Sequence, residues 1–342
     1  MNILFFGLGS IGQRHLRNIN TLFPNYNFFA FRRKFKTPLL NNLNKPLSGR
    51  VTLHDKYKIT YVESLKSLVK KNKIDAAFIC TPTSYHLKEL LWCLKNNIHA
   101  FVEKPISSNL KKIYLLKKLI KNKKNILVSI GYQMRFNPLI NFIKNNLVQK
   151  KYLGEIFMVA VHNGEHISDY HSYESYKDSY TSKKHLGGGV VLTQIHEIDY
   201  LKYIFDKFKF LKNSSLCTTS SNLKLDVEDV YSSTIILKNK KKKILINLSC
   251  NFFERPKSRT IKFICEKGTL YADLNSNFIK IFTKNKIIVK KFKFKRNILF
   301  LEEVKKFFSL IKNKEMIKKN NLNLDQEINT LKFAEKIKKN FF

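Results

Sequence analysis

A short apolar run followed at once by three spaced glycines is the feature that most constrains the fold. The run MNILFF (residues 1–6) predicts a buried strand, and GLGSIG (residues 7–12) leads from it into an amphipathic segment over residues 11–22. Glycines in this context allow a tight turn and close approach of the backbone to a pyrophosphate, as in dinucleotide-binding proteins. The residues expected to bind a dinucleotide are Gly7, Gly9, Ser10, Ile11 and Gly12.

The same alternation of apolar runs and amphipathic segments continues through about the first 120 residues. It predicts βαβ units and a parallel sheet. The predicted strands are residues 1–6, 27–31, 59–62, 74–79, 99–102 and 126–130. The predicted helices are residues 11–22, 64–71, 84–96, 110–122 and 138–148.

The pattern changes after residue 153, where strands follow one another with few helices. A lysine run at residues 238–243 predicts a solvated hairpin turn. The predicted strands are residues 155–161, 230–237, 244–251, 259–265, 269–273, 278–283 and 286–292, and the predicted helices are residues 190–205, 299–311 and 326–339.

The two patterns predict two domains. We expect an α/β Rossmann dinucleotide-binding domain over residues 1–122 and an α+β domain with a large, mostly antiparallel open sheet over residues 123–342. The second domain is expected to bind the substrate. An open sheet leaves one face to be covered, and a second copy of the chain would cover it, so a homo-oligomer (dimer or tetramer) is expected.

The chain is strongly basic, with 64 Lys and Arg against 25 Asp and Glu and a net charge of +39. Such a charge can serve nucleic acid or a membrane surface. Here the lysines are spread through every predicted helix, and the abundance of Lys, Asn, Ile and Phe together fits a bias toward AT-rich codons. We therefore interpret the charge as a solvated surface that attracts anionic small molecules, and we do not expect nucleic acid as a partner.

The sequence also bears on the compartment. The opening MNILFF lacks the basic region that precedes the apolar core of a signal peptide. No apolar run approaches the ~20 residues that a membrane span needs. The five cysteines show no CxxC spacing and are interpreted as reduced core residues, so a cytoplasmic protein without membrane contact is expected.

The end of the second predicted strand bears on which dinucleotide binds. An NAD site usually has Asp or Glu there, which binds the ribose 2′-hydroxyl. This strand is followed by Arg32, Arg33 and Lys34, which could bind a 2′-phosphate instead. We favour NADP over NAD, although Arg32 could also simply stack on adenine.

Two further motifs each follow a predicted strand, at the edge of the sheet where ligands bind. They are CTPTSYH (residues 80–86) and FVEKP (residues 101–105). Each alone could be a turn or a strand terminator, but both are expected to meet the glycine loop. Their residues expected to contact the cofactor are Thr81, Pro82, His86, Glu103 and Lys104.

Together these motifs resemble those of the Gfo/Idh/MocA family of NAD(P)-dependent oxidoreductases. The resemblance extends over nearly the whole chain, through GYQMRF (residues 131–136), GGG (187–189), HEID (196–199) and EKGTL (266–270). It implies that Lys104 lies beside the nicotinamide and the substrate hydroxyl, with Pro105 after a cis peptide. A partly desolvated lysine with a lowered pKa can take the proton that an alcohol loses when it gives up hydride.

His196 is the second catalytic residue that the resemblance implies. The family usually has an Asp three or four residues earlier on the same helix face, whereas this chain has Leu192 and Thr193. His196 can still exchange a hydrogen bond with a substrate oxygen. The missing acid leaves open a different substrate, a slower enzyme or a member that has lost its chemistry.

The segment between the two catalytic motifs is rich in aromatic and polar residues, which suits a sugar ring. It resembles a family branch found among bacterial surface-sugar (polysaccharide) biosynthesis proteins. His162, His166 and His171 match no strong metal template, so no metal is expected. Arg259 could face an anionic substrate or pair within the sheet. The residues expected at the substrate are Tyr132, Arg135, Asp169, His171, Tyr176, Thr193 and His196.

The sequence thus predicts an oxidoreductase that transfers hydride between NADP or NAD and a ring carbinol or ketone of a sugar, cyclitol or nucleotide sugar. The missing acid keeps open a protein that binds NADP without catalysis. The net charge keeps open, as a weaker alternative, a nucleic-acid-binding protein.

Overall fold

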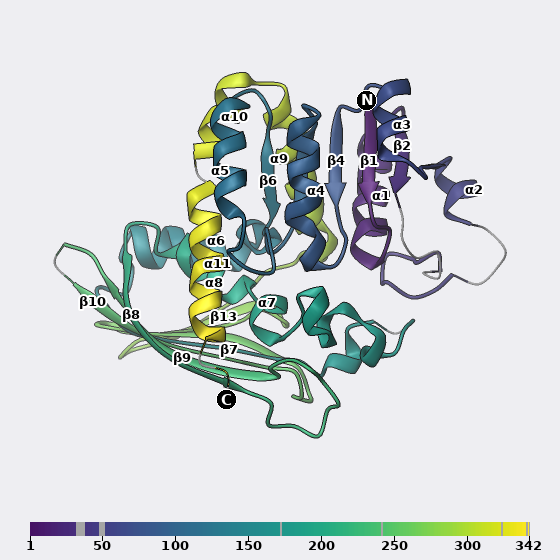
Figure 1. Ribbon diagram of the computed structural model, residues 1–342. Helices are drawn as coiled ribbons and strands as arrows, with labels where there is room; N and C mark the ends of the chain where they lie inside the picture. The colour runs from purple at the N-terminus through teal and green to yellow at the C-terminus, as the bar shows by residue number, and fades with distance from the viewer. Residues whose placement is uncertain are drawn as a thin grey trace.

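A computed structural model of the chain describes residues 1–31, 38–47, 52–171, 173–240, 242–322, 324–339 and 341. It has two layers, with a parallel sheet and its helices above and a wide curved sheet below (Figure 1). The predicted two-part α/β and α+β architecture is confirmed.

The first sheet has six strands in the order β3-β2-β1-β4-β5-β6, and every pairing within it is parallel. Its strands are β1 (Asn2–Phe6), β2 (Asn27–Phe31), β3 (Thr60–Tyr61), β4 (Ala76–Ile79), β5 (His99–Glu103) and β6 (Val128–Gly131). The central strands are buried on both faces, as expected of a parallel sheet covered by helices. The domain limit after residue 122 stays a prediction, and β6, which follows it, pairs with β5.

Helices from both ends of the chain cover this sheet (Figure 1). Phe307 on α9 packs its ring against Phe78 and Phe101, at centroid distances of 5.3 and 5.7 Å. Asn320 on α10 donates to the carbonyl of Val128 on β6. The helices are α1 (Ser10–Leu22), α2 (Leu53–Tyr57), α3 (Leu65–Lys71), α4 (Thr83–Lys95), α5 (Ile113–Asn122), α9 (Asn297–Ile311) and α10 (Lys314–Leu322).

The second sheet has eight strands in the order β14-β13-β12-β11-β7-β10-β9-β8. The β7–β10 pair is parallel and the other pairs are antiparallel. The predicted lysine turn is confirmed, because Lys238 pairs with Lys243 across the β9–β10 hairpin. The strands are β7 (Ile156–Gly164), β8 (Lys209–Thr218), β9 (Val230–Lys238), β10 (Lys243–Asn251), β11 (Ser258–Cys265), β12 (Gly268–Asp273), β13 (Phe278–Phe282) and β14 (Ile287–Lys291).

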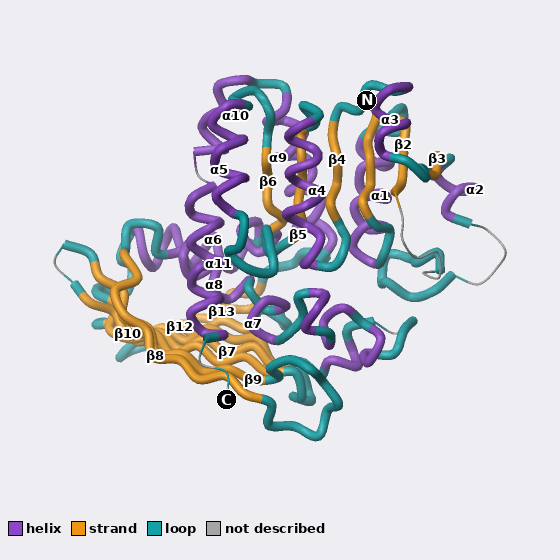
Figure 2. Tube along the Cα trace, viewed as in Figure 1, coloured by secondary structure: helices purple, strands orange, loops and turns teal. Residues whose placement is uncertain are grey.

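Helices lie on the upper face of this second sheet, toward the first domain (Figure 2). The alternating burial of β10 shows that one face is buried and the other exposed. The exposed large apolar side chains on these strands include Leu216, Leu245, Ile264, Phe282 and Ile287. The remaining helical elements are η1 (Gln133–Phe136), α6 (Pro138–Phe142), η2 (Ile143–Gln149), η3 (Ile167–Asp169), η4 (Tyr176–Asp178), η5 (Tyr180–Ser182), η6 (Lys184–Leu186), α7 (Val190–Thr193), α8 (His196–Ile204) and α11 (Leu324–Lys338).

Two expectations about elements were wrong. The helix predicted over residues 190–205 is broken into α7 and α8, and the two predicted closing helices are three. The strand β8 was not predicted, because its sequence KFLKNSSLCT lacks a clean alternation of apolar and polar residues.

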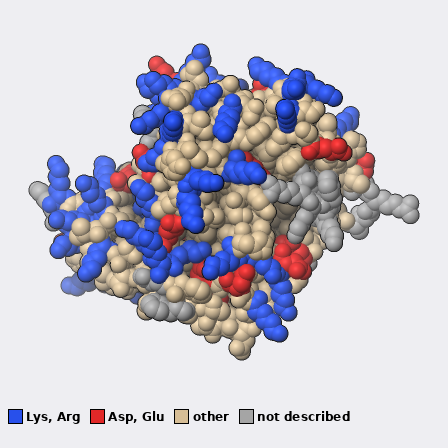
Figure 3. Space-filling view, in the orientation of Figure 1, with Lys and Arg blue, Asp and Glu red and all other residues tan. Residues whose placement is uncertain are grey.

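Lys and Arg side chains are scattered across the whole face seen in Figure 3, with smaller groups of Asp and Glu between them. Within the described ranges, no helix is both long enough and apolar enough to cross a membrane.

Candidate active site

A cavity of about 1640 Å³ lies where the two layers meet. Its lining includes the turn after β1, the ends of β4 and β5, and residues of β7, β11, the α7–α8 segment and the start of α9. The carboxyl ends of the parallel strands thus form one wall, as in other doubly wound sheets that bind ligands.

The glycine loop has the shape of a dinucleotide site. Gly7 has a φ of 82°, which favours glycine, and a Cβ on Gly12 would lie 2.4 Å from the carbonyl oxygen of Gly7. A Cβ on Gly9, in contrast, would have nothing within 4 Å. Gly9 therefore presents bare backbone to open space at the start of α1, where a pyrophosphate can approach and bind. This arrangement fits a dinucleotide, and Ser10 and Ile11 line the same cavity.

Arg32 and Arg33 lie outside the described residues, so the expectation that they bind a 2′-phosphate stays a prediction.

The two motifs that follow β4 and β5 are tied together by a buried histidine. The ring nitrogens of His86 lie 2.7 Å from the carbonyl oxygen of Pro105 and 2.8 Å from that of Thr81. Burial lowers the pKa of His86 despite these two carbonyls. Thr81 donates its hydroxyl to Glu89, so Thr81 and Pro82 are fixed beside the Lys104 motif.

Lys104 is the central cation of the cavity. It precedes Pro105 through a cis peptide, as the resemblance implied, and its Nζ donates to the carbonyl oxygen of Thr193 at 2.5 Å. Burial lowers the pKa of Lys104 to about 8, with Arg259 and Arg296 acting in the same direction and Glu103 and Glu197 against it. A lysine with such a pKa can both take and return a proton near neutral pH.

Glu103 supports this lysine from the side of the first domain. Its carboxylate lies 2.7 Å from Nε2 of the fully buried His15, and it accepts weakly from the backbone N–H of Lys104 at 3.3 Å. Although Glu103 lines the cavity, its side chain is 10 % exposed and directed to His15.

The break between α7 and α8 explains the Lys104 contact. In an unbroken helix the carbonyl of Thr193 would accept from the N–H of Glu197, whereas here that N–H donates to Gln194. The carbonyl of Thr193 is therefore free for Lys104. The break also means that the side chains of Thr193 and His196 do not share a helix face in the way the sequence suggested.

His196 lies at the start of α8, 7 % exposed, and lines the cavity. Its pKa is lowered well below the usual value, first by burial and then by Lys104, Arg259, Arg296 and Arg135. The ring is therefore neutral. Its Nδ1 atom is buried without a hydrogen-bond partner among the described residues.

Other buried polar atoms near His196 also lack a hydrogen-bond partner. Within the described part of the chain, no partner is found for Thr193 Oγ1, Gln194 Oε1 or Glu197 Oε2, and all three residues line the cavity. Buried polar atoms usually have hydrogen-bond partners. Their concentration here indicates a site that takes a polar ligand.

The segment after β7 reaches the glycine loop. Nε2 of His171 lies 3.3 Å from the hydroxyl of Ser10, and Nδ1 lies 2.9 Å from a carboxylate oxygen of Glu174. His171, which we expected at the substrate, therefore lies at the dinucleotide end of the cavity. Asp169 lines the cavity too, but its carboxylate is bound by Arg255.

Three residues expected at the substrate do not line this cavity. Arg135 is held by the buried carboxylate of Asp199 at 2.5 Å and by Glu327 at 2.8 Å, so its charge is compensated inside the protein. Tyr132 is buried between the Arg135 guanidinium and the His196 ring, whose centroid is 6.0 Å away. Tyr176 packs against the core. These three residues support the site from behind.

Several lining residues were not identified from the sequence. Tyr170, Tyr173 and Tyr180 line the cavity where Tyr176 was expected, and their signal was the aromatic richness of the segment. Arg296 also lines it and had no signal, because one basic residue among 64 does not stand out. Arg259 lines the cavity and pairs at 2.7 Å with Glu197 of α8, so its partner lies on a helix and not within the sheet.

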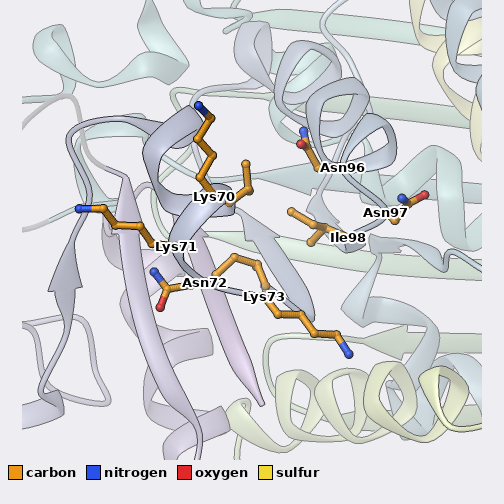
Figure 4. Close-up of a pocket in the computed structure, with 9 residues that line it drawn as sticks. Lys70, Lys71, Asn72, Lys73, Asn96, Asn97 and Ile98 are labelled. Atoms are coloured by element: carbon orange, nitrogen blue, oxygen red, sulfur yellow. The ribbon is translucent and has the colours of Figure 1, made fainter.

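A second hollow, of about 430 Å³, lies at the opposite end of the parallel strands (Figure 4). It is lined by the turns before β4 and β5, with Lys70, Lys71 and Lys73 pointing outward. None of the motif residues reaches it. Across the described residues, no three His, Cys, Asp or Glu side chains are grouped so that they could hold a metal ion.

Known proteins share this fold. A 3-ketoreductase from Actinomadura kijaniata, solved with NADP, superposes with a TM-score of 0.77 at 12% identity, covering 100% of this chain and 98% of that one. A scyllo-inositol dehydrogenase from Lactobacillus casei, solved with NAD(H) and scyllo-inositol, superposes with a TM-score of 0.69 at 20% identity, covering 100% and 96%. At these identities the likeness shows the fold alone.

Sequence comparison gives the family. The oxidoreductase YrbE of Bacillus subtilis is 25% identical over 204 residues, 58% of this chain and 52% of that protein, so the chain spans about half the length of such relatives. The model of the oxidoreductase family with an NAD-binding Rossmann fold matches residues 1–132, and the model of the GFO/IDH/MocA C-terminal domain matches residues 145–271. The chain therefore belongs to the GFO/IDH/MocA family of oxidoreductases.

Proposed function

We propose that this chain is an NAD(P)-dependent dehydrogenase or reductase that acts on a ring carbinol or ketone of a sugar, cyclitol or nucleotide sugar. The observation that carries the proposal is the placement of Lys104 and the neutral His196 in one cavity with the glycine loop. The scyllo-inositol dehydrogenase and the 3-ketoreductase described above share the fold. Their names support a polyhydroxylated ring as the substrate of this chain.

Residues of both domains would act in the proposed reaction. The loop of Gly7, Gly9 and Ser10 would hold a nicotinamide dinucleotide, which would supply the hydride chemistry at the carbinol or ketone carbon. Lys104 would take the hydroxyl proton as a neutral amine in oxidation and give it back as an ammonium in reduction. The carbonyl of Thr193 would orient Nζ, and neutral His196 would exchange a hydrogen bond with the reacting oxygen.

A second candidate is a protein that binds the dinucleotide without catalysis. It is favoured by the composition around His196, where Thr193 stands in place of the usual acid and Nδ1 has no partner within the described ranges. Such a protein would bind NADH or NADPH, but adding any of the sugars would leave the nicotinamide absorbance unchanged.

The deciding experiment titrates the protein with NADH and NADPH and then screens sugars, inositols and nucleotide sugars for a change in nicotinamide absorbance. Lys104→Ala should lose turnover by a factor of about 100 or more when measured at saturating dinucleotide. Lys111→Ala, which removes an exposed lysine, should behave as wild type. Full activity of Lys104→Ala would refute the mechanism, and failure to bind either dinucleotide would refute the whole proposal.

We also propose a homo-oligomer in the cytoplasm. The exposed apolar side chains on the outer face of the second sheet would be covered by a second copy, since large apolar patches mark interaction surfaces. The five cysteines are free and buried, which suits a reducing compartment. Light scattering that gave a monomer mass at micromolar concentration would refute the oligomer.

A further inference from the structure

Arg296 is a cation in the cavity for which the fold itself gives no use. It directly precedes α9 and lines the same cavity as Lys104 and His196. Within the described residues its guanidinium has no hydrogen bond or ion pair, although an arginine carries five N–H donors.

Three of the acidic residues that line the cavity are already paired with another cation. Glu197 is paired with Arg259, Asp169 with Arg255, and Glu165 lies 3.8 Å from Lys257. Burial and Arg259 lower the pKa of Arg296, and Glu165 acts in the opposite direction. Two arginines that repel each other beside a cavity are unfavourable unless an anion joins them.

The Arg259 side chain also lines this cavity. Its Nε donates to Oε1 of Glu197 at 2.8 Å, its Nη2 lies 2.7 Å from the same oxygen, and no bond from Nη1 is found in the described structure. Arg296 is also close enough to Lys104 and His196 to lower the pKa of both. Arg259 and Arg296 therefore line one cavity with Lys104 and His196.

We propose that Arg296, together with the free edge of Arg259, binds an anionic group of the substrate, a carboxylate or a phosphate. This inference rests on the proposed function and narrows its substrate to an acidic or phosphorylated ring. A planar guanidinium binds either oxyanion with two parallel hydrogen bonds, which orients as well as attracts. The anion would hold the ring so that its carbinol meets Lys104.

The test measures binding to the protein saturated with NADH or NADPH, by calorimetry, for matched neutral and anionic probes. The probes are glucose, glucuronate, a glucose phosphate and UDP-glucose. Wild type should bind at least one anionic probe about 10–100-fold more tightly than glucose, since hydrogen bonds to charged groups contribute about 1.5–3 kcal/mol. Preference for glucuronate would assign the anion to a ring carboxylate, and preference for the phosphate or UDP-glucose would assign it to a phosphoryl group.

Variants decide whether Arg296 is responsible. Arg296→Gln should remove the preference for the anion, Arg296→Lys should keep part of it, and Lys293→Gln, which removes an exposed charge nearby in the chain, should keep all of it. Equal binding of neutral and anionic probes, or an unchanged preference in Arg296→Gln, would overturn the inference.

One further outcome separates the substrate from the cofactor. Arg14 on α1 also feels the charge of Arg296, so a phosphate of the dinucleotide is the competing ligand. If Arg296→Gln weakened NADPH but not the anionic sugars, the inference would be overturned in favour of the cofactor. Failure of wild type to bind any dinucleotide would instead refute the proposed function.

Discussion

Two glycines of the loop after β1, Gly9 and Gly12, can be substituted to separate binding from folding. Gly9→Ala adds a methyl group to open space, whereas Gly12→Ala adds one 2.4 Å from the carbonyl oxygen of Gly7. Both residues belong to the same loop and both substitutions add the same group. They are therefore matched controls for each other.

The expected stabilities follow from the local geometry. At Gly12 the new Cβ meets rigid backbone well inside the 3.4 Å of ordinary contact, and overpacking of this kind costs about 1–3 kcal/mol. The better helix propensity of Ala returns about 0.8–1.0 kcal/mol. Gly12→Ala should therefore lose up to about 2 kcal/mol, a fall in Tm of several degrees.

Gly9→Ala should leave the folded protein almost unchanged. The φ of Gly9 is −69°, which alanine adopts readily, and the loss of chain entropy in the unfolded state stabilises by about 0.4–1 kcal/mol. The poorer N-cap that Ala makes offsets this gain. The Tm should therefore stay close to that of wild type.

Dinucleotide binding should fall in both variants. A methyl group on Gly9 would occupy the space through which a pyrophosphate reaches the backbone. We expect the Kd for the dinucleotide to rise by at least about tenfold, which corresponds to about 1.4 kcal/mol of binding free energy. The assays are calorimetric unfolding of the protein without dinucleotide and fluorescence titration with NADH and NADPH. A Gly9→Ala protein that bound both dinucleotides as tightly as wild type would refute the assignment of this loop.

Three other predictions concern buried charge. Because the pKa of Lys104 is about 8 and oxidation needs its neutral amine, kcat/KM for oxidation should rise with pH through that value and then level off; a profile flat across this range would contradict the role of Lys104. Burial raises the pKa of Glu303 well above its usual value, so the folded state keeps a proton that the unfolded state releases. Stability should therefore fall as pH rises above about 4.3, by up to about 1.4 kcal/mol per pH unit. Glu303→Gln should remove that part of the fall in urea denaturation measured at several pH values, and an unchanged slope would show that Glu303 is ionised in the fold. Arg135→Ala leaves the buried carboxylates of Asp199 and Glu327 uncompensated and should cost about 3–5 kcal/mol in the free energy of unfolding; a loss below about 1 kcal/mol would place its guanidinium elsewhere.

The elements that sequence predicts well are those fixed by local chemistry. The alternation of apolar and polar residues in β9 and β10 and the lysine turn between them are encoded within each segment. The same holds for the strand, glycine loop and helix at residues 2–22, where steric limits at Gly7 and Gly12 demand glycine.

The break between α7 and α8 could not be predicted, because residues 190–204 contain neither Gly nor Pro to mark where a helix would stop. The break is compensated by partners from elsewhere: Lys104 takes the freed carbonyl of Thr193, and Gln194 donates to Tyr170 and to the carbonyl of Asn251. Tertiary contacts of this kind outweigh local preference.

Only part of the candidate site could be predicted, because tertiary contacts also decide which motif residues reach the cavity. Motif position brought Lys104, His86 and His196 to one cavity, since each follows a strand or loop whose end the fold fixes. Arg135 has the same motif character, but two acids far along the chain, Asp199 and Glu327, turn it inward. Only the three-dimensional structure shows that Arg135 is paired with buried acids, whereas Arg296 lines the cavity.

The return of α9 and α10 to the first sheet has a consequence for synthesis on the ribosome. Phe307 completes the aromatic packing over Phe78 and Phe101, more than two hundred positions after them in the sequence. The dinucleotide-binding layer therefore cannot close its core while the middle of the chain is still being made. Until α9 emerges, Phe78 and Phe101 lack this packing partner, and apolar surface left uncovered in this way makes a nascent chain prone to aggregate.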